Sequence, residues 1–276
     1  MLKIDRKIIL LFILLISISF LNKYWISEYI IEQLEIKHER LFNIGLNFFL
    51  VLIMLLFLFR KTKVKISLKP TSKIYNIWYL LPFLLFFAYQ SFSLDYDYLL
   101  SKKIIFILST LFIIYIQCFV EEFIFRGLLI NNYLIKGKGI TKSVIFSAII
   151  FGLSHSASFL KEENAFSVFN QIIIAVFIAV LLGALYVAIK NIYLLAFLHL
   201  LINLPAYINR IIVEPGSDAI INQVNNNSLF ENMLSSFMII LLYSPILLLG
   251  LVIIYKVKKT HNFDEIKTFD EHPFLF

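Results

Sequence analysis

The chain has 276 residues, of which 60% are hydrophobic and only 16% charged, and its mean hydropathy is +0.86. A chain with so few polar residues cannot cover the surface of a water-soluble globular protein. The composition therefore predicts an integral membrane protein and excludes a soluble nucleic-acid-binding protein. The net charge of +7 is explained by lysines and arginines in loops beside the membrane. A single cysteine, Cys118, excludes an intramolecular disulfide and a cysteine-rich metal site.

The N-terminal part, residues 1–103, contains three apolar runs that predict membrane helices: Ile8 to Leu21, Ile44 to Phe59 and Ile74 to Phe92. Basic residues precede the first run and small residues lie at its end, so this run also fits a signal peptide. Whether it is cleaved stays open, and its removal would leave the orientation of the other helices unchanged.

The central part, residues 104–212, contains four further apolar runs: Ile104 to about Leu129, Lys142 to about Leu160, Phe166 to Ile189, and Ile192 to Ile212. Gly137 and Gly139 follow the first of these runs and predict the end of its helix. In the third run, Ala175, Ala179 and Gly183 recur at every fourth position. Such a stripe of small residues predicts the close approach of a neighbouring helix.

The C-terminal part begins with a polar stretch, Asn209 to Asn232, from which we expect an external loop over residues 213–236. Residues 237–276 follow as a last membrane helix, Phe237 to Tyr255, and a tail. Basic residues fall in alternate connections between the runs and acidic residues in the others, which predicts that both termini are cytoplasmic. The predicted fold is therefore an all-α, polytopic transmembrane bundle of about eight helices in the plasma membrane.

Six polar residues lie inside the central apolar runs, where an ionised group costs a few kcal/mol to insert: Glu121, Glu122, Arg126, His155, His199 and Asn203. Glu122 and Arg126 are four residues apart and share a helix face, as do His199 and Asn203. Glu121 is turned about 100° from Glu122 on the same helix. Three helices therefore each offer a polar group to a common centre.

These residue types can hydrolyse a peptide bond without a nucleophilic serine or cysteine. A carboxylate beside an imidazole can activate water as a general base, and Glu121 with His155 is the predicted pair. An imidazole and a carboxamide can stabilise the oxyanion that forms at the amide carbonyl, which is the role predicted for His199 and Asn203. Alternatively, Glu121, His155 and His199 can hold a zinc ion that activates the water, although no His-Glu-x-x-His motif is present.

The three segments Glu121-Glu122-Phe-Ile-Phe-Arg126, Phe151-Gly-Leu-Ser-His155 and His199-Leu-Leu-Ile-Asn203 resemble the EExxxR, FxxxH and HxxxN motifs of the CAAX protease and bacteriocin-processing family, also called CPBP or Abi. The resemblance covers about residues 120–204. It implies an intramembrane protease in which Glu121 and His155 activate water, His199 and Asn203 form the oxyanion hole, and Glu122 and Arg126 are a supporting pair. It also implies a membrane-associated peptide or protein substrate of the CAAX, pheromone or bacteriocin type.

Other interpretations of the same residues stay open at the level of sequence. Glu122 and Arg126 also fit an ion pair that snorkels to the interface. Ser154 and Ser156 flank His155 and resemble a nucleophile beside a base, but serines in apolar helices usually bond to their own backbone. The alternatives to a protease are a membrane scaffold or bacteriocin-immunity partner, and a proton-coupled transporter. The high content of Ile, Phe, Lys and Asn is typical of a low-GC bacterium.

Overall fold

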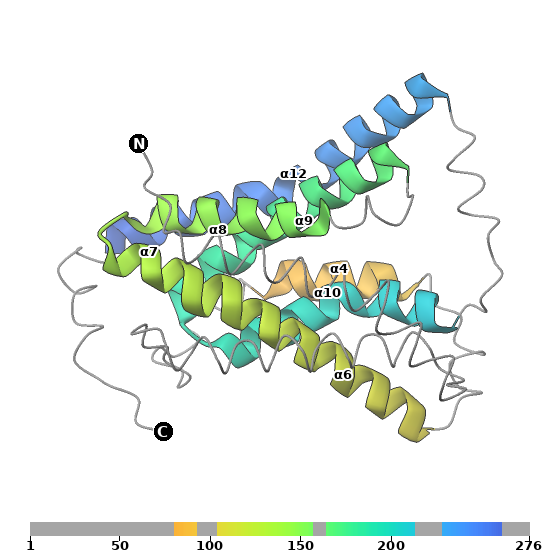
Figure 1. Ribbon diagram of the computed structural model, residues 1–276, viewed down its shortest axis with the longest axis horizontal. Coiled ribbons are helices and arrows are strands. Elements are labelled where there is room, and N and C mark those ends of the chain that lie inside the picture. The colour runs from red at the N-terminus through yellow and green to blue at the C-terminus, as the bar shows by residue number, and fades with distance from the viewer. Residues whose placement is uncertain (1–79, 93–103, 157–163, 213–227, 261–276) are drawn as a thin grey trace, which may run out of the picture. The chain divides into compact units, whose positions relative to one another are not determined.

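The computed structural model describes residues 80–92, 104–156, 164–212 and 228–260, and every regular element in these ranges is a helix (Figure 1). In chain order they are α4 (Leu81–Ser91), α6 (Ile104–Glu122), the π-helix η3 (Phe123–Ile130), α7 (Asn131–Ile135), α8 (Ile140–Ser154), α9 (Ala165–Ile189), α10 (Ile192–Ile212) and α12 (Leu229–Thr260). This confirms the all-helical class for the described ranges. The first two predicted spans and the C-terminal tail lie outside them, and the number of spans and the orientation of the termini stay predictions.

The helix bounds agree with the sequence in the middle of the chain and depart from it elsewhere. The predicted span 192–212 matches α10, and α9 begins one residue before its predicted start. The α8 helix ends at Ser154, so the expected continuation to Leu160 is wrong for the turn that carries His155. The α12 helix begins at Leu229, upstream of the predicted start at Phe237.

Backbone geometry and capping side chains determine where the helices end and begin. Gly137 and Gly139 have φ angles of 70° and 76°, a region that favours glycine, which confirms the predicted stop after α7. The α9 helix ends at Lys190 in the left-handed conformation. Next to it, the Asn191 side chain accepts a hydrogen bond from the backbone N–H of Leu194 at 3.1 Å and so caps α10.

The chain divides into two compact units. The described residues of the first unit fall within Phe83–Glu121 and Ala196–Val213, so this unit contains most of α6 and of α10. In it a small apolar cluster of Ile114, Cys118 and Leu200 joins the two helices. The second unit includes Glu122–Leu195 and Glu214–Phe276, and therefore η3, α7, α8, α9 and α12.

Glycines set the spacing of the helices in the second unit. A Cβ on Gly183 of α9 would lie 2.9 Å from Cγ1 of Val144 in α8, which confirms the close approach predicted from the small-residue stripe. A Cβ on Gly152 of α8 would collide with Cγ2 of Val176 in α9. On the other side of α9, a Cβ on Gly250 of α12 would lie 3.0 Å from the Leu181 backbone. The α8 and α12 helices therefore both pack directly on α9.

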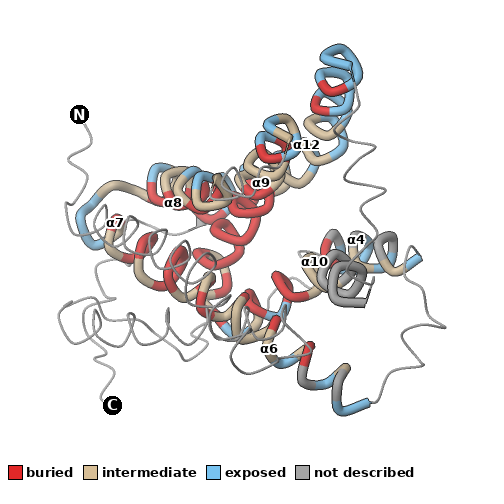
Figure 2. The backbone as a smooth tube through the Cα atoms, turned by 45° about the vertical axis from the view of Figure 1, so that its right-hand side comes forward, coloured by how far each residue is buried: buried red, intermediate tan, exposed pale blue. Residues whose placement is uncertain are grey.

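The α9 and α12 helices lie side by side but differ in how far they are buried (Figures 1 and 2). Most of α9 is buried between its neighbours, whereas α12 exposes large apolar side chains along much of its length, including Phe230, Phe237 and Leu242. Within the described ranges, Ala165–Ile189 and Leu229–Lys259 are the two helices long and apolar enough to cross a membrane. An exposed apolar helix surface is expected where lipid replaces water as the solvent.

Pro245 lies inside α12, where its missing N–H leaves the carbonyl of Leu241 without its usual helical donor. The Ser244 hydroxyl donates a hydrogen bond of 2.9 Å to that same carbonyl. Because a bare carbonyl in lipid costs several kcal/mol, this side chain explains why the helix continues through the proline.

Candidate active site

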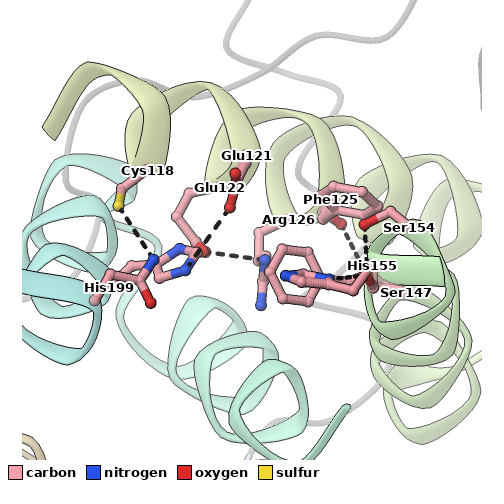
Figure 3. A network of polar contacts seen from close by, with 11 residues as sticks. Cys118, Glu121, Glu122, Phe125, Arg126, Ser147, Ser154, His155 and His199 are labelled. Atoms are coloured by element: carbon pink, nitrogen blue, oxygen red, sulfur yellow. Dashed lines mark hydrogen bonds and ion pairs between the residues drawn. The ribbon is translucent and has the colours of Figure 1, made fainter. Parts of the chain in front are cut away.

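In the first unit, Glu121 lies next to His199. Glu121 is near the end of α6 and His199 is on α10, and the carboxylate Oε2 is 3.7 Å from the imidazole Nε2 (Figure 3). The His199 side chain is only 4% exposed, whereas that of Glu121 is 27% exposed. The structure thus brings a partly accessible carboxylate to a buried imidazole.

A further side chain that the sequence analysis did not identify holds Glu121 from the other side. Gln117 is one turn earlier on α6, and its Nε2 donates a hydrogen bond of 3.2 Å to Oε1 of Glu121. The two carboxylate oxygens therefore have different neighbours, an amide at Oε1 and an imidazole at Oε2. The spacing of four residues was the available signal, because residues four apart share a helix face.

Asn203 lies on α10 one turn after His199, as the sequence predicted. Its Nδ2 donates a hydrogen bond of 3.8 Å to Sγ of Cys118, which is on α6 one turn before Glu121. Both predicted oxyanion donors therefore face α6 within the first unit. The single cysteine is buried and acts here as an acceptor for a carboxamide.

In the second unit, Glu122 and Arg126 form a buried ion pair. Arg126 NH1 is 3.0 Å from Glu122 Oε1, and the side chains are 1% and 0% exposed (Figure 3). This burial is contrary to the snorkelling interpretation, in which the guanidinium would reach the surface. A buried charge is strongly destabilising once its partner is removed, so the pair fits the supporting role expected for it.

Arg126 lies on η3, where the sequence predicted an uninterrupted α-helix. π-helical turns are rare and often occur at functional sites. The Ser147 hydroxyl of α8 donates a hydrogen bond of 2.7 Å to the backbone carbonyl of Phe125 in η3, and both residues are buried. This contact ties the π-helix to α8.

His155 follows α8 directly and forms its C-cap. Its Nδ1 is 3.1 Å from the backbone carbonyl of Phe151, and the two rings meet edge-on with centroids 5.0 Å apart. The Ser154 hydroxyl donates a hydrogen bond of 2.6 Å to the same carbonyl. This backbone contact agrees with the expectation that Ser154 is not a nucleophile.

The predicted site residues thus fall into two groups, one in each unit. Glu121, His199 and Asn203 belong to the first unit, whereas Glu122, Arg126 and His155 belong to the second. The pairing of Glu121 with His155 stays a prediction.

A metal centre requires at least three ligands with common access to one point. Among the described residues, no three His, Cys, Asp or Glu side chains are grouped so that they can hold a metal ion. Glu121 and His199 are two of the three predicted zinc ligands and lie together, and His155 is the third. The donor set thus contains a pair of ligands, and zinc binding stays an alternative that only a metal measurement decides.

Comparison with known proteins gives one family match. The model of the family described as type II CAAX prenyl endopeptidase Rce1-like matches residues 103–205. No curated protein and no solved structure matches the chain. The matched segment contains Glu121, His155, His199 and Asn203, together with η3. It confirms, over residues 103–205, the resemblance drawn from the three motifs.

Proposed function

We propose that this protein is an intramembrane endopeptidase that hydrolyses a peptide bond in a membrane-associated peptide or protein. The observation that carries the proposal is the pair in the first unit, where Oε2 of Glu121 is 3.7 Å from Nε2 of His199. Peptide hydrolysis needs a base for the water and a donor for the oxyanion, both about 3 Å from the reacting atoms. A carboxylate and an imidazole at this separation can serve one tetrahedral centre.

In the proposed mechanism, Glu121 and His155 accept a proton from water, and the oxygen attacks the carbonyl carbon of the scissile bond. The carbonyl oxygen becomes negatively charged and accepts hydrogen bonds from His199 Nε2 and Asn203 Nδ2. The C–N bond then breaks as the proton passes to the leaving amine. Asn203 donates one N–H to Cys118 in the structure, which leaves the second N–H of its amide for the substrate oxygen.

The family match supports a prenylated substrate of the CAAX type. Pheromone or bacteriocin precursors are the other substrates that fit a membrane-embedded site. An apolar peptide anchor would suit the exposed apolar surface of the helices.

The first test is peptide cleavage by the purified full chain in lipid nanodiscs, with prenylated and unprenylated membrane-anchored peptides. Glu121→Gln keeps the shape of the side chain but removes the base, and we expect its rate to fall by about 10²- to 10⁴-fold. The matched control is Glu231→Gln, because Glu231 is exposed at the start of α12 and accepts hydrogen bonds from Ser228 that glutamine can also accept. Equal cleavage by Glu121→Gln and wild type would remove Glu121 from the mechanism, and an inactive wild type would oppose the hydrolase.

Dialysis against a chelator tests the zinc alternative on the same sample. The metal-free mechanism predicts unchanged cleavage and no zinc retained by the purified protein. Loss of cleavage that added zinc restores would instead support the zinc alternative, in which Glu121, His155 and His199 are the predicted ligands. Zinc would then supply the activated water.

A further inference from the structure

The second unit contains a continuous chain of contacts from the buried ion pair to His155. Arg126, held by Glu122 at 3.0 Å, has its guanidinium carbon 4.9 Å from the centroid of the Phe151 ring. A guanidinium at this distance over an aromatic face is attracted by the ring quadrupole, more strongly when both groups are desolvated. Arg126 and Phe151 are 1% and 3% exposed, so this contact is buried.

Phe151 in turn contacts His155 in two ways, through its ring and through its backbone carbonyl. The rings meet edge-on at 5.0 Å, and the Phe151 carbonyl is 3.1 Å from His155 Nδ1. A carbonyl oxygen only accepts hydrogen bonds, so Nδ1 must carry the proton. In the neutral imidazole this leaves the lone pair on Nε2.

We propose that Glu122, Arg126 and Phe151 are positioning residues that set the rotamer and the tautomer of His155. The buried ion pair fixes the guanidinium, and the guanidinium holds the Phe151 ring. The ring and the carbonyl of Phe151 then hold the imidazole with Nε2 as its acceptor. The EExxxR and FxxxH motifs are thereby parts of a single device. The proposal rests on the proposed function for the role of His155 in catalysis, whereas its structural content can be measured without any substrate.

Restraint of this kind is needed at His155 because the helix ends there. The residue forms the C-cap of α8, so its side chain lies at the very end of the α-helix. Gly152 brings the same turn close to α9, since a Cβ there would lie 3.0 Å from the carbonyl of Ile172. The backbone is therefore held by α9, while the imidazole is held through Phe151.

The experiment uses Phe151→Leu, which keeps an apolar side chain and removes the aromatic face. Phe146→Leu is the matched control, because Phe146 also lies on α8 and stacks on Tyr133 with centroids 4.5 Å apart. In full-length protein in nanodiscs with ¹⁵N-labelled histidine, the His155 ring signals are assigned from His155→Gln. We expect wild type and Phe146→Leu to show the Nδ1–H tautomer. Phe151→Leu keeps the backbone carbonyl but loses the ring that holds the imidazole against it, so we expect this variant to show a mixture of the two tautomers.

The kinetic readout uses the peptide that wild type cleaves. Loss of a group that orients a catalytic side chain typically costs about 10- to 100-fold, so we expect kcat of Phe151→Leu to fall by this amount with KM unchanged. Arg126→Lys keeps the charge opposite Glu122 but loses the planar guanidinium, and we expect it to shift the tautomers in the same direction. It also serves as the second variant if Phe151→Leu does not fold.

The proposal is overturned if both variants keep the wild-type ring signals, whatever their activity. An inactive wild type with the expected change of tautomers would reject the proposed function and leave the positioning device standing. An active wild type whose variants keep the wild-type tautomer would support the proposed function and reject the positioning role of Glu122, Arg126 and Phe151.

Discussion

Glu121 is the residue at which the environment of a single side chain bears most directly on the chemistry. Oε1 accepts a hydrogen bond from Gln117, and Oε2 faces His199 (Figure 3). A carboxylate with one oxygen occupied has a defined orientation, and the remaining oxygen is directed at the imidazole. A base must lie within hydrogen-bond reach of the proton that it accepts, so in the proposed mechanism this orientation selects the water that Glu121 activates.

Replacement of Gln117 tests this orientation. Gln117→Met keeps the length of the side chain and removes its donor. We expect kcat to fall about tenfold, which corresponds to roughly 1.4 kcal/mol, because the carboxylate gains rotational freedom. Gln117→Glu should cost more, since it places a second carboxylate beside Glu121. Steady-state cleavage of the membrane-anchored peptide measures both, and full activity of Gln117→Met would show that the hydrogen bond has no part in catalysis.

At the scale of single helices, the π-helix η3 and the proline in α12 are two places that depart from regular α-helix. At each of them a serine hydroxyl donates a hydrogen bond to a backbone carbonyl. In η3, Ser147 of α8 donates to the carbonyl of Phe125, and in α12, Ser244 donates to the carbonyl that Pro245 leaves without its helical donor. Both irregularities thus have a side-chain hydroxyl as partner. This pattern is expected where no water is present to satisfy a backbone carbonyl.

A double-mutant cycle tests the role of Ser244. Ser244→Ala should destabilise the protein by about 1 kcal/mol in nanodiscs, since it leaves the Leu241 carbonyl without a donor. In a Pro245→Ala background the same change should cost little, because the helical N–H returns. Ser236→Ala is the control, because the Ser236 hydroxyl also donates to the carbonyl four residues earlier, in a turn that lacks proline. Thermal unfolding measures the cycle, and equal costs in both backgrounds would contradict the assignment.

At the scale of the whole molecule, the length of α12 and the charges at its ends bear on how the chain crosses a membrane. Its apolar part, Leu229–Lys259, has 31 residues and is therefore about 46 Å long, compared with a hydrocarbon core of about 30 Å. Glu231 lies in its first turn, and Lys258 and Lys259 lie in its last. This charge distribution is part of the basis for the prediction that the C-terminal end of the helix faces the cytoplasm.

Cysteine labelling in intact cells tests this orientation. Phe230→Cys and Lys258→Cys place thiols at exposed positions near the two ends of α12, and Cys118 is buried, so the unsubstituted chain provides the blank. We expect an impermeant maleimide to label Phe230→Cys in intact cells and Lys258→Cys only after permeabilisation. Labelling of both positions from the same side would reject α12 as a membrane span.

The family and the candidate residues could be predicted from the sequence because the cost of burying charge is a local property. Each of Glu121, His155, His199 and Asn203 is conspicuous in its own apolar run, whatever surrounds it. The bounds of α9 and α10 were predictable for the same reason, since a long apolar run with capping residues at its ends needs no tertiary contact to be identified.

Contacts between helices decided the rest. Only the tertiary structure shows that His199 lies beside Glu121, that Asn203 donates to Cys118, and that Arg126 packs on Phe151. The π-helical turn likewise lies in a sequence that favours an α-helix and is tied to Ser147 of a different helix. Periodicity along a helix predicts which residues share a face, but the partner of that face depends on how the helices pack, and this packing is a property of residues far apart in the chain.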